Sequence, residues 1–106
     1  MLSLTREEAL RLHRQMWTDM QKALGDCPSH EERKRFKERW CREHTPEALP
    51  RANCYLCEYI KQIDAGNCND SCPIDWGYFI CMYGKVDYRY SPISDILALP
   101  ERKEAP

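Results

Sequence analysis

Apolar residues recur at helical spacing over the first part of the chain. Steps of three and four residues place these side chains on one face of an α-helix. Thr5 and Glu8 have the spacing of a capping box at its start, and Gly25 follows its last apolar residue. The pattern predicts an amphipathic helix over about residues 5–25, with its apolar stripe in the core. The stripe consists of Ala9, Leu12, Met16, Met20 and Ala23, with His13, Trp17 and Leu24 on its edge.

A second helix is predicted after the turn Cys27-Pro28-Ser29. Ser29 and Glu32 repeat the capping-box spacing, and the pattern runs to about His44. Its consistently apolar positions are Phe36, Trp40 and Cys41, and most of the others are charged. We interpret the charged run as a solvated face with opposite charges at helical spacing, such as Glu38 and Arg42. The alternative is a basic face that contacts phosphates.

Two shorter helices are expected in the second half. The first follows Cys54, with Tyr55, Leu56, Tyr59, Ile60 and Ile63 as its apolar positions and Gly66-Asn67 as its end. The second begins after Ser91-Pro92, with Ile93, Ile96 and Leu97 turned inward. We therefore expect a mostly α fold: a helical hairpin arm packed on a small four-cysteine zinc-knuckle module, a short C-terminal helix and at most a short strand pair.

Prolines at positions 46 and 50 suggest a boundary in the chain. The predicted organisation is a helical arm at 1–50, a zinc-binding module at 51–99 and a mobile tail at 100–106.

Composition limits the size of the core. With 106 residues, 31% of them charged, one modest core is expected, so that a bound metal would add needed folding free energy. The net charge of −1 divides into +2 over residues 1–53 and −3 over residues 54–106. This asymmetry is far from the charge of a typical nucleic-acid-binding domain.

The cysteines carry the most specific pattern. Cys54 and Cys57 form a C-x-x-C pair, and a ten-residue insert separates it from Cys68 and Cys72. Two thiol pairs at this separation can supply the four ligands of a tetrahedral zinc. Cys81 is an alternative fourth ligand, because the Cys68-x-x-x-Cys72 spacing is one residue longer than the commonest knuckle. Disulfides, an iron–sulfur cluster and free thiols are the competing interpretations. An odd total of seven cysteines and the lack of an apolar leader argue against secretion and disulfides, so we expect a reducing, cytoplasmic location.

The remaining cysteines and histidines are expected to lie outside the metal site. Cys41 follows Trp40 in the second helix and is predicted to be a small buried side chain. Cys27 is expected to be a spectator, and the Cys41–His44 spacing is a minor metal-site alternative. His13 and His30 have no ligand spacing.

Aromatic residues are crowded into the last third of the chain. Aromatic side chains are favoured anchors of protein interfaces, although some of these must belong to the core. The predicted partner-binding residues are Trp76, Tyr78, Tyr83 and Tyr88.

Four segments carry a family resemblance: 5–9 (TREEA), 13–17 (HRQMW), 53–59 (NCYLCEY) and 72–76 (CPIDW). Together they resemble small cysteine-rich proteins encoded by tailed phages and prophages of Gram-positive bacteria. The resemblance implies a zinc-stabilised phage accessory protein and points to no particular activity. Small phage proteins often bind and block a host protein, including bacterial defence proteins. The extra residue between Cys68 and Cys72 departs from the family pattern.

No catalytic motif accompanies these features. The sequence has no Gly-rich phosphate loop, no HExxH motif and no nucleophile beside an evident base. We therefore expect a non-catalytic protein that binds a bacterial host protein, with inhibition of that protein as the expected consequence. The alternative is a zinc-knuckle protein that binds nucleic acid or regulates transcription.

Overall fold

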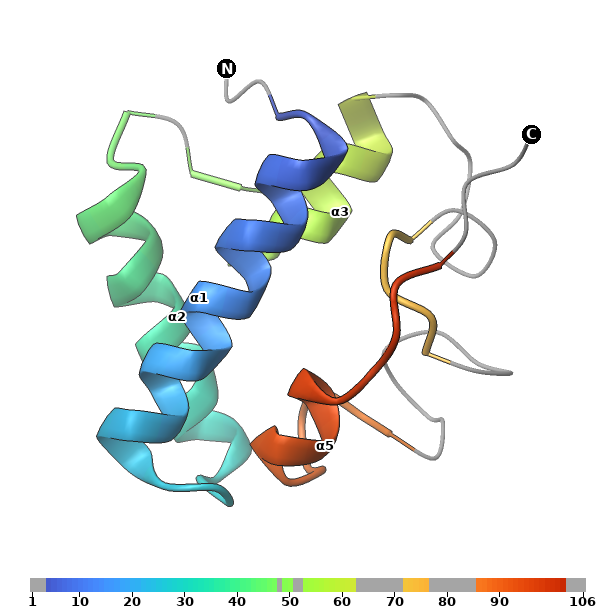
Figure 1. Cartoon of the computed structure of the whole chain (residues 1–106). Coiled ribbons are helices and arrows are strands. Elements are labelled where there is room, and N and C mark those ends of the chain that lie inside the picture. Colours follow the sequence, from blue (N-terminus) through green and yellow to red (C-terminus); the bar gives the residue numbers. More distant parts are fainter. Residues whose placement is uncertain (1–3, 48, 51–52, 63–71, 77–85, 103–106) are drawn as a thin grey trace.

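Helices make up most of the fold. The computed structural model describes residues 4–47, 49–50, 53–62, 72–76 and 86–102 of the chain. This confirms the mostly α fold that the periodicity predicts. The helices of the described residues are α1 (Arg6–Leu24), α2 (His30–His44), α3 (Tyr55–Gln62) and α5 (Ile93–Leu97) (Figure 1).

Both long helices begin where the local sequence predicts. At α1, Thr5 Oγ1 accepts the Glu8 N–H at 3.1 Å and Glu8 Oε1 accepts the Thr5 N–H at 3.2 Å. Ser29 and Glu32 form the same reciprocal pair at α2, with distances of 3.1 and 3.0 Å. Each box satisfies two backbone donors that a helix start leaves unpaired. Gly25 ends α1 with φ +83°, a backbone conformation that L side chains rarely adopt.

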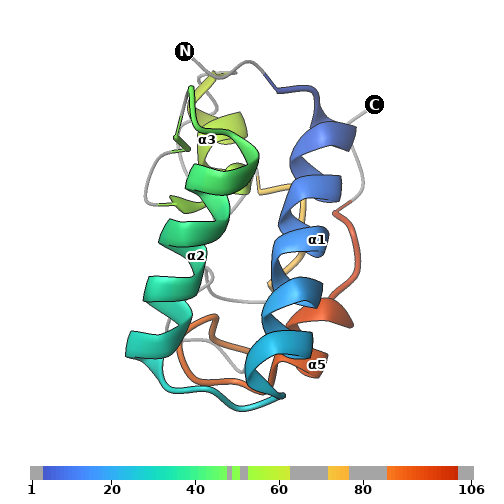
Figure 2. The same ribbon diagram turned by 90° about the vertical axis from the view of Figure 1, so that its left-hand side faces the viewer.

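Helix α1 is the central element of the molecule. Helices α2, α3 and α5 all pack against it, and α2 runs antiparallel beside it (Figure 2). Trp40 Nε1 on α2 donates to Asp19 Oδ2 on α1 at 2.8 Å, and this hydrogen bond lowers the pKa of the Asp19 carboxyl. The helical hairpin is therefore held by a buried apolar stripe with a polar link beside it.

One hydrophobic core includes residues from both halves of the chain. Met16, Trp17 and Met20 of α1 lie in it with Tyr55 of α3 and Ile93 of α5. The arm and the predicted zinc module thus share a core, and the boundary at residue 50 stays a prediction. The buried face of α1 differs from the predicted stripe in two places. Leu10, which the predicted stripe does not include, is buried. Ala23 and Leu24, which the prediction placed on or beside the stripe, are exposed in the last turn, beyond the elements that cover the rest of it.

The segment 72–76 pairs with the chain after α5. Ile74 and Glu101 form an isolated antiparallel bridge, and the Arg102 N–H donates to the Pro73 carbonyl at 2.7 Å. Arg102 Nε also donates to the Cys72 carbonyl at 2.9 Å. Residues 100–102 therefore belong to the folded part of the chain, which corrects the prediction of a mobile tail from residue 100.

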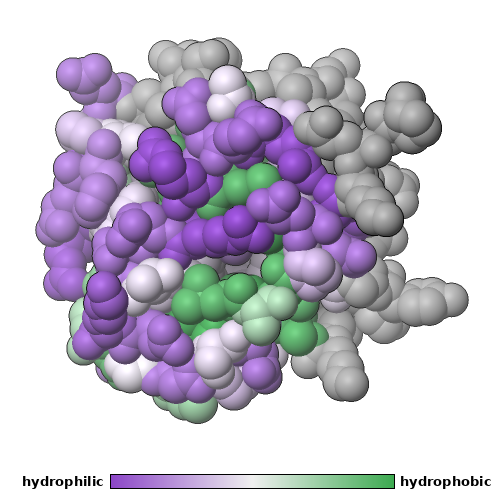
Figure 3. All heavy atoms as spheres, in the orientation of Figure 1, coloured by the Kyte–Doolittle hydropathy of each residue, from purple (hydrophilic) through white to green (hydrophobic). Residues whose placement is uncertain are grey.

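The surface of the described residues is largely polar. On the face shown in Figure 3, apolar surface lies on both sides of a hydrophilic band. Among the described residues, no helix has the length and apolar character needed to cross a membrane.

Candidate functional site

Cys54 and Cys57 lie together at the start of α3. Cys54 Sγ accepts the Cys57 N–H at 3.3 Å, so the first thiol sits against the free backbone donors of the helix. The pKa of the Cys54 thiol falls to about 6, mainly because the Cys57 side chain hydrogen-bonds to it. The charge of Lys37 and the backbone N–H groups of Cys57 and Leu56 lower the pKa further, whereas burial raises it. Cys54 therefore has thiolate character at neutral pH, as a metal ligand requires.

Of the other predicted ligands, the structure describes only Cys72. Cys72 is buried, and its backbone carbonyl accepts from Arg102. Cys68 and Cys81 lie outside the described residues. Over the part of the chain that the structure describes, no group of three or more His, Cys, Asp or Glu side chains is arranged to hold a metal ion. The described residues thus contain Cys54, Cys57 and Cys72 of the predicted site, and the full ligand set stays a prediction.

Cys41 and His44 make other contacts. Cys41 is fully buried, and burial raises the pKa of its thiol. The His44 ring stacks on Trp40 with centroids 3.7 Å apart, and its Nδ1 lies 2.9 Å from the Trp40 carbonyl oxygen. Cys27 is exposed. Cys41 is thus a small core side chain, as predicted.

Two basic residues of α2 are buried, which corrects the interpretation of its charged positions as solvated. Arg33 is 1% exposed and Lys37 is 8% exposed. Arg33 donates through Nε to the Pro28 carbonyl at 3.0 Å and through Nη1 to the Tyr88 carbonyl at 2.9 Å. The solvated interpretation holds for Arg35 and Arg39, which are exposed and paired with acids four residues away.

The ammonium group of Lys37 lies among aromatic rings. Its Nζ is 4.8 Å from the centroid of Tyr88 and 5.9 Å from the Trp17 ring, both within the range of cation–π attraction. In the described chain, no carboxylate lies within salt-bridge distance of Lys37.

A cationic pocket of about 310 Å³ opens at this point. We call it the α2 pocket. Asn53 contributes from the loop before α3, with a left-handed backbone at φ +54°, a region that Asn tolerates better than most residues. The residues that line the α2 pocket are His30, Arg33, Lys34, Lys37, Asn53 and Tyr88.

A hydrogen-bonded turn holds two tyrosines beside the α2 pocket. Arg89 pairs with both carboxylate oxygens of Asp87, at 3.1 and 2.9 Å, and the Asp87 N–H donates to Ser91 Oγ at 2.8 Å. Tyr90 is 64% exposed, and the His30 ring contacts Tyr88 and Tyr90 at centroid distances of 6.3 and 5.7 Å. We call His30, Tyr88 and Tyr90 the tyrosine surface.

The predicted aromatic anchors have different locations. Trp76 is 6% exposed in the core, with its ring edge-on to His13 at 6.4 Å. It is therefore not a surface anchor, because its ring fills the space beside α1. Tyr88 is half-buried at the α2 pocket, whereas Tyr78 and Tyr83 lie outside the described residues. Among the described aromatic residues, Tyr90 is the exposed one, and its sequence position alone does not distinguish it from its neighbours.

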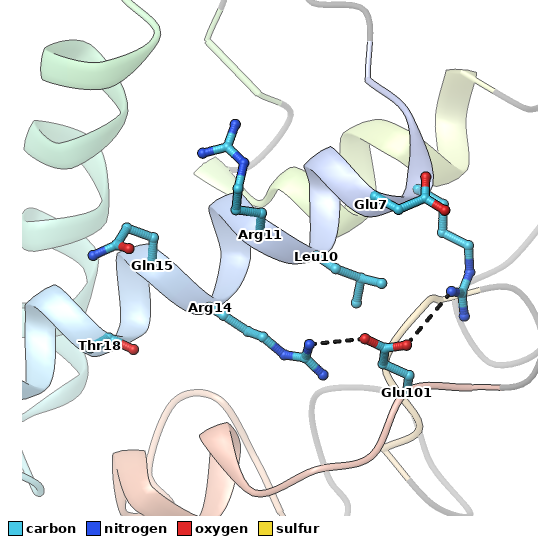
Figure 4. A pocket seen from close by; sticks show the side chains of 8 residues that line it. Glu7, Leu10, Arg11, Arg14, Gln15, Thr18 and Glu101 are labelled. Carbon is cyan, nitrogen blue, oxygen red and sulfur yellow. Dashed lines mark hydrogen bonds and ion pairs between the residues drawn. The ribbon is translucent and has the colours of Figure 1, made fainter.

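A second, larger hollow of about 460 Å³ follows the polar side of α1. Here Arg14 extends to Glu101, with Nη1 and Oε1 2.9 Å apart, and Arg6 lies 4.0 Å from the same carboxylate (Figure 4). An internal carboxylate thus neutralises much of the charge in this hollow, in contrast to the α2 pocket.

Comparison with known proteins gives no relative: the chain matches no protein-family model, no curated protein and no solved structure.

Proposed function

We propose that the chain is a non-catalytic, zinc-stabilised interaction protein that binds a bacterial host protein and blocks the surface it covers. In this proposal the zinc is held by Cys54, Cys57, Cys72 and either Cys68 or Cys81, or by both of the latter in place of Cys72. The metal adds folding free energy to a small core. The protein acts in the bacterial cytoplasm, where thiols stay reduced.

The observation that supports binding is the exposed and rigidly held Tyr90. Its turn is fixed by Asp87, Arg89 and Ser91, and Arg33 ties the turn to α2 through the Tyr88 carbonyl. Rigid aromatic side chains bind with a small loss of conformational entropy, and Tyr is enriched among residues that dominate interface energetics. The tyrosine surface is therefore our proposed centre of the interface.

The experiment is affinity capture from a bacterial lysate, followed by a binding titration with the captured protein. We expect Tyr90→Ser to weaken binding about thirtyfold, corresponding to about 2 kcal/mol for an interface anchor. Leu49→Ser is the matched control, because Leu49 is also a large exposed apolar residue but follows the C-terminal end of α2, whereas His30 of the tyrosine surface begins that helix. Equal affinity of Tyr90→Ser and wild type for the captured protein would contradict the proposal.

Nucleic-acid binding is the second candidate, and the α2 pocket is the observation that favours it. A phosphate backbone would contact Lys34 and the exposed arginines of α2, so reversal of Arg35 and Arg39 would abolish binding. The affinity would also fall steeply between about 50 and 200 mM salt. For the protein interface we expect weak salt dependence and a small effect of both reversals.

A further inference from the structure

We propose that the α2 pocket binds the phosphate group of a small phosphate monoester. The site goes beyond the protein interface proposed above. Its central observation is Lys37, which lines the pocket although the residue is only 8% exposed, and whose Nζ lies 4.8 Å from the ring centroid of Tyr88, another lining residue. A buried charge is costly unless it is paired, and the described chain places no carboxylate at salt-bridge distance from it.

The charge of the pocket favours a dianion. Arg33, Lys34 and Lys37 contribute three positive charges. The two hydrogen bonds of Arg33 to Pro28 and Tyr88 go to neutral carbonyl oxygens and leave its charge uncancelled. Asp26 and Asp87 lie near enough for their charges to act on Arg33. In the described chain neither carboxylate comes within salt-bridge distance of Arg33, Lys34 or Lys37, and Asp87 pairs with Arg89.

The proposed metal ligand Cys54 directly follows Asn53, so the pocket lies next to the proposed metal site. Within the described residues, no carboxylate pairs with Arg33, Lys34 or Lys37. The pocket therefore keeps a positive balance that a phosphate dianion can neutralise.

The donors of the pocket fit a tetrahedral oxyanion. Lys37 and Lys34 each carry three N–H donors, and Asn53, in the loop before α3, adds a side-chain amide. None of these three side chains donates a hydrogen bond within the described residues. A carboxylate would occupy two acceptor positions and bring one charge, whereas phosphate brings three terminal oxygens and two charges. A volume of about 310 Å³ also leaves room for the organic part of a monoester.

The experiment is calorimetric titration of the reduced full-length chain with inorganic phosphate, AMP and adenosine, in phosphate-free buffer at about 0.1 M chloride. We expect saturable binding of phosphate and AMP, with adenosine at least about tenfold weaker than AMP. Tighter binding of AMP than of inorganic phosphate would identify a monoester as the ligand. Equal affinity for AMP and inorganic phosphate would show that the pocket recognises the phosphate group alone, with free phosphate as the ligand.

Variants test whether the α2 pocket is the site. Lys37→Met should weaken AMP binding about tenfold or more, because a buried charge-assisted contact is lost. Lys34→Gln, at an exposed position where folding is not at risk, should weaken it about threefold or more. Lys22→Gln removes the same charge from an exposed position on α1 and should change nothing.

Three results of the titrations would overturn the proposal. They are the absence of saturation by phosphate and AMP up to about 20 mM, equal binding of adenosine and AMP, and unchanged AMP affinity in Lys34→Gln and in folded Lys37→Met. Amide shift changes on adding AMP give a readout independent of the variants: they should centre on Asn53 and Lys37, and changes centred on α1 at Arg11 and Arg14 would contradict the site.

Discussion

At the scale of single residues, polar side chains in the core distinguish this protein from a simple helical hairpin. His13 is buried between the rings of Trp17 and Trp76, each with its centroid 6.4 Å away. Burial lowers the pKa of His13 to about 3, and the positive charges of Lys37 and Arg14 act in the same direction. The folded chain therefore holds this histidine neutral.

The low pKa of His13 predicts a loss of stability in acid. The unfolded chain takes up a proton near pH 6.5, while the folded chain does so only near pH 3. Stability from this residue is thus fully present above pH 6.5 and is lost as the pH falls towards 3. The free energy of unfolding should fall by about 1.4 kcal/mol per pH unit inside this window, or about 2 kcal/mol by about pH 5.

Chemical denaturation of wild type and His13→Gln at several pH values measures this slope. Loss of the proposed zinc in acid would affect both proteins equally, so the difference between their slopes reports on His13. We expect the variant to lose about one proton of pH dependence between about pH 5 and 6. Identical slopes, or a His13 ring that titrates near its ordinary pKa by NMR, would show that the residue is not held neutral.

Arg33 and Lys37 show why some residue environments escape sequence reasoning. Charged positions on a helix are normally solvated, and Arg35 and Arg39 follow that rule. The carbonyl that accepts from Arg33 Nη1 belongs to Tyr88, 55 residues away. No local pattern in α2 contains that partner, so the burial of Arg33 could not be predicted.

At the scale of elements, helices with local caps were predictable. Thr5, Ser29 and Gly25 each act on residues within one turn, and the structure confirms all three. The N-terminus of α5 is capped in a different way, because its N-cap residue Pro92 provides no side-chain hydrogen bond. Asp26, in the loop between α1 and α2, instead accepts from the Ser94 N–H at 2.7 Å and the Ser94 hydroxyl at 2.8 Å. This cap is supplied from 68 residues away and has no sequence signature.

The remote cap predicts that Asp26 holds α5 in place. In Asp26→Ala, we expect the Ser94 amide to exchange with solvent about fivefold faster or more, because its hydrogen-bond acceptor is removed. Hydrogen exchange followed by NMR measures this rate. Asp95→Ala is the matched control: Asp95 is an exposed acid in the first turn of the same helix. Unchanged Ser94 exchange in Asp26→Ala would mean that α5 is held by its apolar contacts alone.

At the scale of the whole molecule, packing decides which candidate residues meet. Cysteine spacing identified the Cys54–Cys57 pair, which the structure places together at the start of α3. The α2 pocket could not be predicted, because it joins α2, Asn53 and Tyr88 only after α1 has packed against α2 and α3. Counting aromatics likewise could not separate Trp76, which is core, from Tyr90, which is exposed.

The central claim is that a structural zinc completes this small fold, and the zinc content of the purified chain tests it most directly. Native mass spectrometry of the reduced, full-length protein should show about one zinc per chain. Cys54→Ser should lose the metal together with the folded second half, because an incomplete first pair cannot hold it. Cys27→Ser should keep both, since Cys27 is exposed and outside the proposed ligand set. Less than about a tenth of an equivalent of zinc in folded, reduced wild-type protein, or equal metal loss in Cys27→Ser and Cys54→Ser, would contradict the claim.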